Sequence, residues 1–332
     1  MMNKTTKWIL WVVLLLILVL YPRLFGFYFT NIFVVFAIYA LYAITFNILL
    51  GYTGLLSFGH AMFFGTGGYA TAIALERIEG LPLFPAILIG LLAAIVLALI
   101  LCPLLVRVSG VAFAMLTLAF GQLMHVLAMK LRWLTGGEDG VGGFPIPPFN
   151  IPGIVSIDIA DPINFYYFAM AVLGVSIWII WFITKTPFGS IQTGIRDNAM
   201  RVDYLGFKVP HTKAIVFIFS SGFAGIAGSI YALFQNLISA DDAFHVGNSF
   251  SPIIMSLVGG IGSFFGPIVG SGVLSIIDEL TSRYTERVDL VTGLILIFVI
   301  MFAPTGVAGF LRFIKEKLFS RTSDKAAMEE TS

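Results

Sequence analysis

Long apolar runs recur along the whole chain and are separated by short polar segments. Most of them approach or exceed the roughly 20 residues that a helix needs to cross the hydrocarbon core of a bilayer. The runs cover residues 8–21, 28–50, 57–75, 84–106, 111–129, 164–184, 213–236 and 288–304. A further apolar region, 250–279, is interrupted by glycines and by Pro267. The pattern predicts an all-α, polytopic membrane protein in which some membrane segments are short or broken at glycine.

The composition agrees with this pattern and excludes several classes of protein. Of the 332 residues, 58% are hydrophobic and only 11% are charged, whereas about a quarter of a typical soluble domain is charged. A net charge of +1 gives no electrostatic reason to expect a nucleic-acid partner. The single cysteine, Cys102, excludes a disulfide framework within the chain and a cysteine-based zinc cluster.

The distribution of basic residues predicts the orientation, because cytoplasmic loops are enriched in Lys and Arg. If the N-terminus lies inside and 250–279 enters and returns, with a turn near Gly262–Ser263, thirteen of the nineteen basic residues fall on the cytoplasmic side. The prediction is therefore about ten transmembrane segments with both termini in the cytoplasm. A single straight helix at 250–279 is the alternative, and it would place the basic tail outside.

The same topology divides the chain into one membrane domain and a tail. We expect a single transmembrane permease domain over 1–311 and a cytoplasmic tail over 312–332. The segment 130–163 becomes the longest extracytoplasmic loop. Its glycines and prolines exclude a continuous helix there.

Charged residues and catalytic motifs are missing from the predicted spans. Asp, Glu, Lys and Arg are confined to loops, tails and the ends of these spans, and only His60 and His125 could titrate in the membrane. Ion-coupled carriers usually need intramembrane ionisable groups. The chain also has no phosphate-binding loop of the Gly-x-x-x-x-Gly-Lys-Ser/Thr type and no hydrolase or metalloprotease signature. We therefore expect no enzyme but a passive conduit that is driven by a partner.

Two glycine-rich stretches, around 51–68 and 259–270, lie inside apolar surroundings. Close helix packing is one explanation, and it also fits a small-residue face at 221, 225 and 229. Alternatively, helix breaks free backbone groups that line a polar route across the membrane. The packing or helix-breaking positions are Gly51, Gly54, Gly59, Gly259, Gly260, Gly262, Gly266 and Gly270, the last three being spaced for one helix face. The polar candidates for the translocation path are Thr53, Ser57, His60, Thr66, Thr117, Gln122, Ser256 and Ser263.

The most informative segment is the basic cytoplasmic loop at 185–213. Asp197 or Asn198 can cap a short helix that ends at Gly206. Residues 199, 202 and 205 are spaced to give this helix an apolar face. Basic loop residues often serve only to set topology, but a capped amphipathic helix between two spans is suited to insertion into a groove on a partner.

Several motifs resemble those of a known family. The Ala199–Gly206 spacing resembles the coupling loop of binding-protein-dependent ABC importer permeases. The stretch GYTGLLSFGHA at 51–61 is similar to the signature of LivM-type permease subunits of branched-chain amino acid importers. At Gln122, family permeases often carry an acidic residue. The resemblance covers about residues 28–311, with further motifs at 117–121 (TLAFG), 135–137 (TGG), 258–262 (VGGIG) and 303–306 (APTG).

The resemblance implies a heteromeric importer in a bacterial plasma (inner) membrane. A LivH-like second permease, two cytoplasmic ATP-binding subunits and an extracytoplasmic solute-binding protein would accompany this chain. The chain would bind no cofactor, and ATP and Mg²⁺ would be held by the ATP-binding subunits. The cargo would be branched-chain amino acids; an importer of urea or short amides and a stand-alone channel are the alternatives. The residues that would couple to the ATPase are Arg196, Asp197, Asn198, Ala199, Leu205 and Gly206.

Overall fold

The computed structural model describes residues 4–151 and 155–284, with a few single residues between 290 and 306. The predicted span 288–304 lies mostly, and the predicted tail 312–332 wholly, outside the described residues. The long helices are α1 (Lys4–Asn47), α2 (Ala61–Arg77), α3 (Leu83–Leu105), α4 (Val111–Lys130), α6 (Pro162–Thr184), α7 (Pro187–Tyr204), α8 (Val209–Gln235), α10 (Val246–Gly259) and α11 (Gly266–Ser282). The shorter elements are η1 (Ile48–Tyr52), α5 (Arg132–Thr135), α9 (Ala240–Phe244), β1 (Val141–Gly142), β2 (Phe149–Ile151), β3 (Val155–Ile157) and β4 (Leu237–Ile238).

The chain is mostly helical, as predicted, and five of the described helices are long and apolar enough to cross a membrane. They are Ile17–Tyr52, Leu83–Leu105, Val111–Lys130, Pro162–Thr184 and Val209–Gln235. Side chains exposed on α3 and α6, such as Phe84, Leu92 and Trp178, are large and apolar, as lipid contact requires. The predicted total of about ten segments and the cytoplasmic position of both termini stay predictions.

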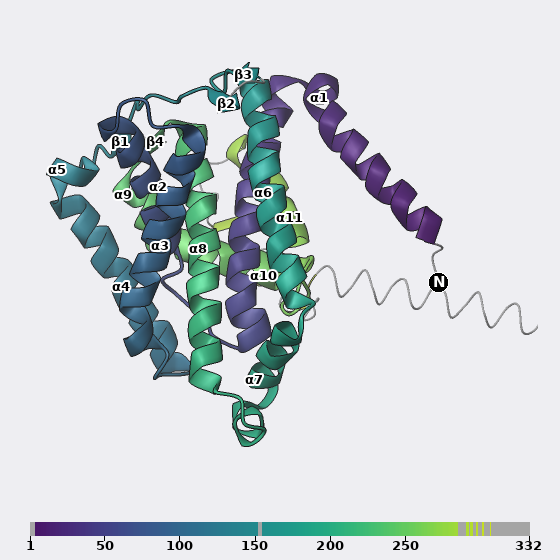
Figure 1. The fold of residues 1–332 in the computed structure, drawn as a ribbon, viewed down its shortest axis with the longest axis vertical. Helices are drawn as coiled ribbons and strands as arrows, with labels where there is room; N and C mark the ends of the chain where they lie inside the picture. The colour runs from purple at the N-terminus through teal and green to yellow at the C-terminus, as the bar shows by residue number, and fades with distance from the viewer. Residues whose placement is uncertain are drawn as a thin grey trace, which may run out of the picture.

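The first long helix consists of two parts that meet at Gly26. This glycine has a φ of 73°, which L side chains rarely adopt, and it lies between the two apolar runs predicted at 8–21 and 28–50. Figure 1 shows the first part of α1 diverging from the bundle, whereas the second part runs through it. The second part is lined by buried residues such as Ile38 and Leu41, which have 0% exposure.

The segments between the helices gather at two opposite ends of the bundle. At one end, here the strand end, β1 pairs antiparallel with β4 and β2 with β3, and Arg77 donates to the carbonyl oxygen of Trp133 at 2.8 Å. The other end carries α7 (Figure 1). The segment 130–163 therefore forms short elements at the strand end and no continuous helix, as its glycines and prolines predict.

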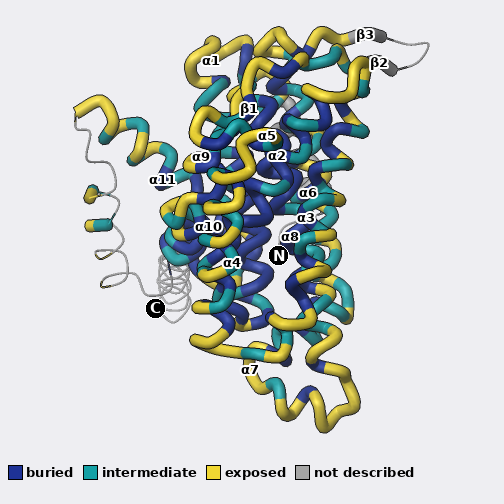
Figure 2. The backbone as a smooth tube through the Cα atoms, turned by 90° about the vertical axis from the view of Figure 1, so that its left-hand side faces the viewer, coloured by how far each residue is buried: buried dark blue, intermediate teal, exposed yellow. Residues whose placement is uncertain are grey.

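Small residues bring α2, α3 and α8 into close backbone contact at the centre of the bundle. A Cβ on Gly225 would lie 2.6 Å from the side chain of Ala94 and 3.2 Å from the carbonyl oxygen of Gly90. Ser229 donates to the carbonyl oxygen of Gly67 at 3.2 Å. The small-residue face predicted at 221, 225 and 229 is confirmed as a packing face, and Figure 2 shows many buried residues along α2 and α8.

A larger residue at Gly228 is expected to destabilise this contact. Its Cβ would overlap the backbone carbonyl of Phe64 on α2, which has no flexible end that could move aside. Overpacking of this kind typically costs about 1–3 kcal/mol. The Gly228→Leu variant should therefore unfold at a lower temperature in detergent. Gly174→Leu on α6 is the matched control, because open space surrounds that position. Equal thermal stability of the two variants would contradict the packing role.

The region 250–279 forms a helical hairpin, α10 and α11, with a turn at 260–265 between them. The turn predicted near Gly262–Ser263 is thus confirmed. At 1.5 Å per residue, the 14 residues of α10 and the 17 of α11 span about 21 and 26 Å, each less than the roughly 30 Å of a hydrocarbon core. The helix-face prediction for Gly262 is wrong, because Gly262 lies in the turn with a φ of 83° and α11 begins only at Gly266.

Candidate functional site

The helical structure of the chain is interrupted between α1 and α2. The π-helix η1 extends α1 to Tyr52, and residues 54–60 are then irregular before α2 begins at Ala61. The first glycine of the irregular stretch, Gly54, has a φ of 72°. π-Helical turns inside α-helices occur often at functional sites. The break predicted at Gly51–Gly54 is present in the structure. In the predicted span 57–75, the helix begins only at residue 61.

Two backbone amides at the end of this break are bonded to side chains of other helices. The amide of Phe58 donates to Oγ1 of Thr117 on α4 at 3.1 Å, and the amide of Ala61 donates to Oγ of Ser249 on α10 at 3.2 Å. Irregular backbone at membrane depth is tolerated where it is buried in protein in this way.

The imidazole of His60 is a packed core group. Its Nε2 lies 3.0 Å from Oγ1 of Thr45, its ring stacks on Tyr42, and the side chain has 0% exposure. Within the described residues, its Nδ1 and the Oγ of Ser57 have no hydrogen-bond partner. Of the eight predicted path residues, only Ser57 and His60 have a buried polar atom that lacks a hydrogen-bond partner in the described part of the chain.

Most of the other predicted path residues use their hydroxyl groups locally. The hydroxyls of Thr53 and Thr66 donate at 2.6 Å to carbonyl oxygens four residues earlier, and that of Thr117 donates to Ala114. Ser256 donates across helices to the carbonyl oxygen of Ala43 at 3.4 Å. These contacts give the hydroxyls structural roles, while Gln122 lies half-buried on α4.

The turn of the α10–α11 hairpin is fastened to the end of α1 by one buried side chain. Nδ2 of Asn47 donates to the carbonyl oxygen of Ser263 at 2.9 Å, and the amide of Gly262 donates to Oδ1 of Asn47 at 3.2 Å. Asn47 is 1% exposed. A Cβ at Gly51 would meet Oδ1 of Asn47 and lie 2.8 Å from the amide nitrogen of Gly262, so only glycine leaves room for this contact.

Arg196 of α7 joins this cluster from the other side. Its guanidinium donates to the carbonyl oxygen of Gly51 at 2.6 Å and pairs with Asp197 at 2.9 Å. Its Nη1 lies 3.1 Å from the position that a Cβ on Gly262 would take. We name the cluster of Asn47, Gly51, Arg196, Gly262 and Ser263 the junction. It connects the three features that stand out in the sequence, namely the two glycine-rich breaks and the loop at 185–213.

The loop at 185–213 contains α7, which consists of two helical parts that meet at Asn198. The φ of −160° at Asn198 is not helical, and its Oδ1 accepts a hydrogen bond from the amide of Arg201 at 2.9 Å. This is the N-cap of a short helix, which ends before Gly206, whose φ is 88°. The predicted capped helix is confirmed, with Asn198 as the cap, while Asp197 pairs with Arg196.

The apolar residues of this short helix divide between two faces. Val202 is buried against Ile195 and Val209, and Ala199 packs against the same cluster. Leu205 is 71% exposed instead, so the single face predicted for Ala199, Val202 and Leu205 is wrong. The exposed apolar face at the tip of α7 consists of Met200, Tyr204, Leu205 and Phe207.

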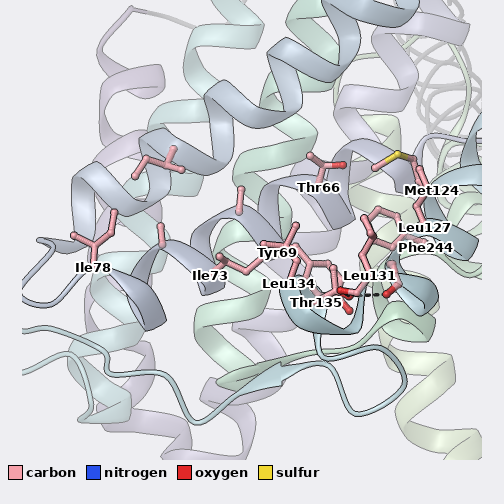
Figure 3. A pocket seen from close by; sticks show the side chains of 14 residues that line it. Thr66, Tyr69, Ile73, Ile78, Met124, Leu127, Leu131, Leu134, Thr135 and Phe244 are labelled. Carbon is pink, nitrogen blue, oxygen red and sulfur yellow. Dashed lines mark hydrogen bonds between the residues drawn. The ribbon is translucent and has the colours of Figure 1, made fainter.

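An apolar cavity of about 450 Å³ lies between α2 and α4, with Phe244 of α9 at its edge. Figure 3 shows Thr66 and Tyr69 of α2 together with Met124 and Leu127 of α4 among the residues that line it. Apart from the hydroxyls of two threonines and Tyr69, the walls are hydrocarbon. Such walls suit an acyl chain and offer no partner for an ammonium or carboxylate group.

The comparisons with known proteins agree on one family. Residues 28–303 match the family model described as "Branched-chain amino acid transport system / permease component". The chain is 27% identical over 286 residues to the high-affinity branched-chain amino acid transport system permease protein LivM of Salmonella typhimurium and to that of Escherichia coli. These matches cover 80% of this chain and 66% of each relative, so the chain matches just under two thirds of their length.

Two further relatives extend the similarity. The probable branched-chain amino acid transport permease protein LivM of Methanocaldococcus jannaschii is 24% identical over 294 residues, which are 78% of this chain and 83% of the relative. The permease protein LivH of Escherichia coli is 28% identical over 130 residues, which are 39% of this chain and 42% of the relative. No solved structure matches the chain.

Proposed function

The chain belongs to the branched-chain amino acid transport permease family, and we propose that it is the membrane-spanning permease subunit of an ABC importer that moves branched-chain amino acids. The observation that carries this proposal beyond the family is the junction. It connects a surface helix, α7, to the two breaks in the membrane helices through partly buried hydrogen bonds. A subunit driven from outside the membrane needs such a connection.

In this proposal, α7 is the contact for a cytoplasmic ATP-binding subunit. Its exposed face presents Met200, Tyr204 and Leu205 at 67%, 83% and 71% exposure, and apolar and aromatic side chains of this kind fill the grooves of partner proteins. Closure of the ATPase pair would move α7, and Arg196 would pass the movement to Gly51. Asn47 would pass it on to the α10–α11 turn.

The proposal extends to the other subunits of such an importer. The similarity of this chain to both LivM and LivH supports pairing with a homologous second permease. Two ATP-binding subunits would hold ATP and Mg²⁺, and an extracytoplasmic binding protein would deliver the solute. The α7 end would face the cytoplasm of a bacterial cell, and the strand end would face the binding protein, with no catalytic step in this chain.

The proposal is tested with the five-component complex reconstituted in proteoliposomes with ATP inside. We expect uptake of radiolabelled leucine, isoleucine and valine that requires both the binding protein and ATP. Leucine flux without ATP through liposomes that contain this chain alone would contradict it, and would identify a channel instead. ATP-dependent uptake of urea or short amides, with none of leucine, would contradict the assigned cargo.

Loss of the α7 cap is expected to weaken coupling. Asn198→Ala removes the acceptor for the amide of Arg201, which typically costs a helix about 1 kcal/mol. We expect leucine uptake to fall by up to about fivefold, because that free energy corresponds to a factor of about five in the ratio of the ordered to the disordered tip. Asn198→Asp keeps a capping oxygen and should retain most of the uptake. Uptake at the wild-type level in Asn198→Ala would contradict a coupling role for the capped helix.

A further inference from the structure

A second cavity, of about 520 Å³, lies between α1, α10 and α11. Figure 1 shows the second part of α1 running beside these two helices. Unlike the cavity between α2 and α4, this one has walls of mixed chemistry. Asp278 and Glu279 of α11 contribute carboxylates, and Tyr39 of α1 and Ser251 of α10 contribute hydroxyl groups. Its volume is within the range of about 300–1,000 Å³ that is usual for small-molecule sites.

The position of the cavity along α1 places it within the membrane-spanning bundle. Asn31 and Tyr39, which both line it, are eight residues apart on a helix, or about 12 Å along the axis. Ionisable side chains on a membrane helix are costly and usually face a water-filled path or a substrate. The two carboxylates of this cavity stand near the C-terminal end of α11, with Asp278 exposed and Glu279 half-buried, and they are candidates for contact with a charged solute that enters the cavity.

The apolar and charged groups are arranged on different walls of the cavity. Ile32 and Val35 of α1 and Met255 of α10 supply hydrocarbon, whereas the carboxylates come from α11. Glu279 also pairs with Arg283, one turn further along α11, at 3.0 Å. An amino acid with an aliphatic side chain would meet carboxylates that suit its ammonium group, and hydrocarbon that suits its side chain.

We propose that this cavity binds the solute in transit, a branched aliphatic α-amino acid, with its ammonium group at the Asp278–Glu279 wall and its side chain against Ile32, Val35 and Met255. This assignment rests on the proposed function and adds the place where the cargo is held. The cavity walls on α10 and α11 belong to the hairpin whose turn is fastened by Asn47. A movement that enters at the junction therefore reaches the cavity along these two short helices.

Photo-leucine, a leucine analogue with a diazirine in its side chain, tests the assignment directly. The complete importer is illuminated in proteoliposomes during ATP-driven uptake, and labelled peptides of this chain are mapped by mass spectrometry. We expect adducts at residues of the cavity wall on α1 and α10, such as Ile32, Val35 or Met255. Adducts around Met124 and Leu127 instead, or no adduct on this chain, would overturn the assignment.

The Asp278→Asn variant gives an independent readout. Loss of a charged partner for the ammonium group should lower the maximal leucine uptake about tenfold or more, while ATP hydrolysis stimulated by the binding protein continues. Glu76→Gln is the control at an exposed carboxylate near the end of α2, and it should transport normally. Wild-type uptake by an assembled Asp278→Asn complex would overturn the inference and leave the proposed function intact, whereas failure of the wild-type complex to import leucine would contradict the proposed function itself.

Discussion

Replacement of Arg196 by alanine is expected to lower ATP-driven leucine uptake about tenfold or more, with the importer still assembled. The guanidinium of Arg196 donates a hydrogen bond to the carbonyl oxygen of Gly51 in η1. Among the described residues, no other side chain of α7 bonds to η1. A charge-assisted hydrogen bond of this kind is worth about 1.5–3 kcal/mol. Its loss removes the side-chain hydrogen bond that joins α7 to η1. Uptake and stimulated ATPase activity are measured on the same proteoliposomes.

The pattern of the two activities separates coupling from folding. In the Arg196→Ala complex we expect ATP hydrolysis to persist while uptake falls. Arg201→Ala on the same helix is the matched control, because the described part of the chain gives that guanidinium no ion pair or hydrogen bond. Arg196→Lys should be intermediate, since an ammonium can reach the carbonyl but lacks the planar fork. Equal uptake in the Arg196→Ala and Arg201→Ala complexes would refute the role of Arg196.

Replacement of Asn47 by leucine is expected to have a similarly large effect on leucine uptake, because Asn47 connects the end of α1 to the α10–α11 turn. The amide of Gly262 and the carbonyl oxygen of Ser263 would both lose their Asn47 partner, and because both hydrogen bonds are partly buried, water replaces that partner only incompletely. Each buried polar group left unsatisfied costs about 1–3 kcal/mol. We expect uptake to fall at least tenfold and the α10–α11 turn to become accessible to proteolysis in detergent.

Asn164→Leu is the control for that substitution. Asn164 lies near the start of α6 and also donates a side-chain hydrogen bond, to the carbonyl oxygen of Asp158, but this bond is exposed at the strand end. Water can replace its bond, so uptake should stay near the wild-type level. A turn that stays protected and a transporter that stays active in Asn47→Leu would contradict the fastening role of Asn47.

The sequence pattern predicts the elements of the fold far better than their contacts. Apolar runs and glycine positions place the long helices, the break near Gly51 and the turn near Gly262, because these features depend on local hydropathy and backbone freedom. The sequence also restricts the cap of the short helix before Gly206 to Asp197 or Asn198, and only the contacts show that Asn198 is the cap while Asp197 pairs with Arg196. The helix-face prediction for Gly262 fails because spacing alone does not show where a helix begins.

The residues that carry the proposed mechanism depend on contacts across the chain and are harder to predict. Asn47 acts on residues 215 and 216 positions away, and the cavity combines α1 with α10 and α11. One feature of the sequence could have indicated both the junction and the cavity. Asn31 and Asn47 are amide side chains inside the apolar run 28–50. A polar side chain in a membrane helix usually has a partner or a functional role. Hydroxyls such as those of Thr53 and Thr66 are weaker signals, because a helix can satisfy them itself.

In the proposed mechanism, the movement driven by the ATPase enters at α7 and reaches the α10–α11 hairpin through the junction. Spin labels at Ile32→Cys on α1 and Ser282→Cys on α11, in a Cys102→Ser background that removes the single native cysteine, report the width of the cavity by electron paramagnetic resonance. In the assembled importer we expect the distance distribution to shift when a non-hydrolysable ATP analogue binds, and the shift to disappear in Arg196→Ala and Asn47→Leu. The same shift in all three proteins would contradict transmission through the junction.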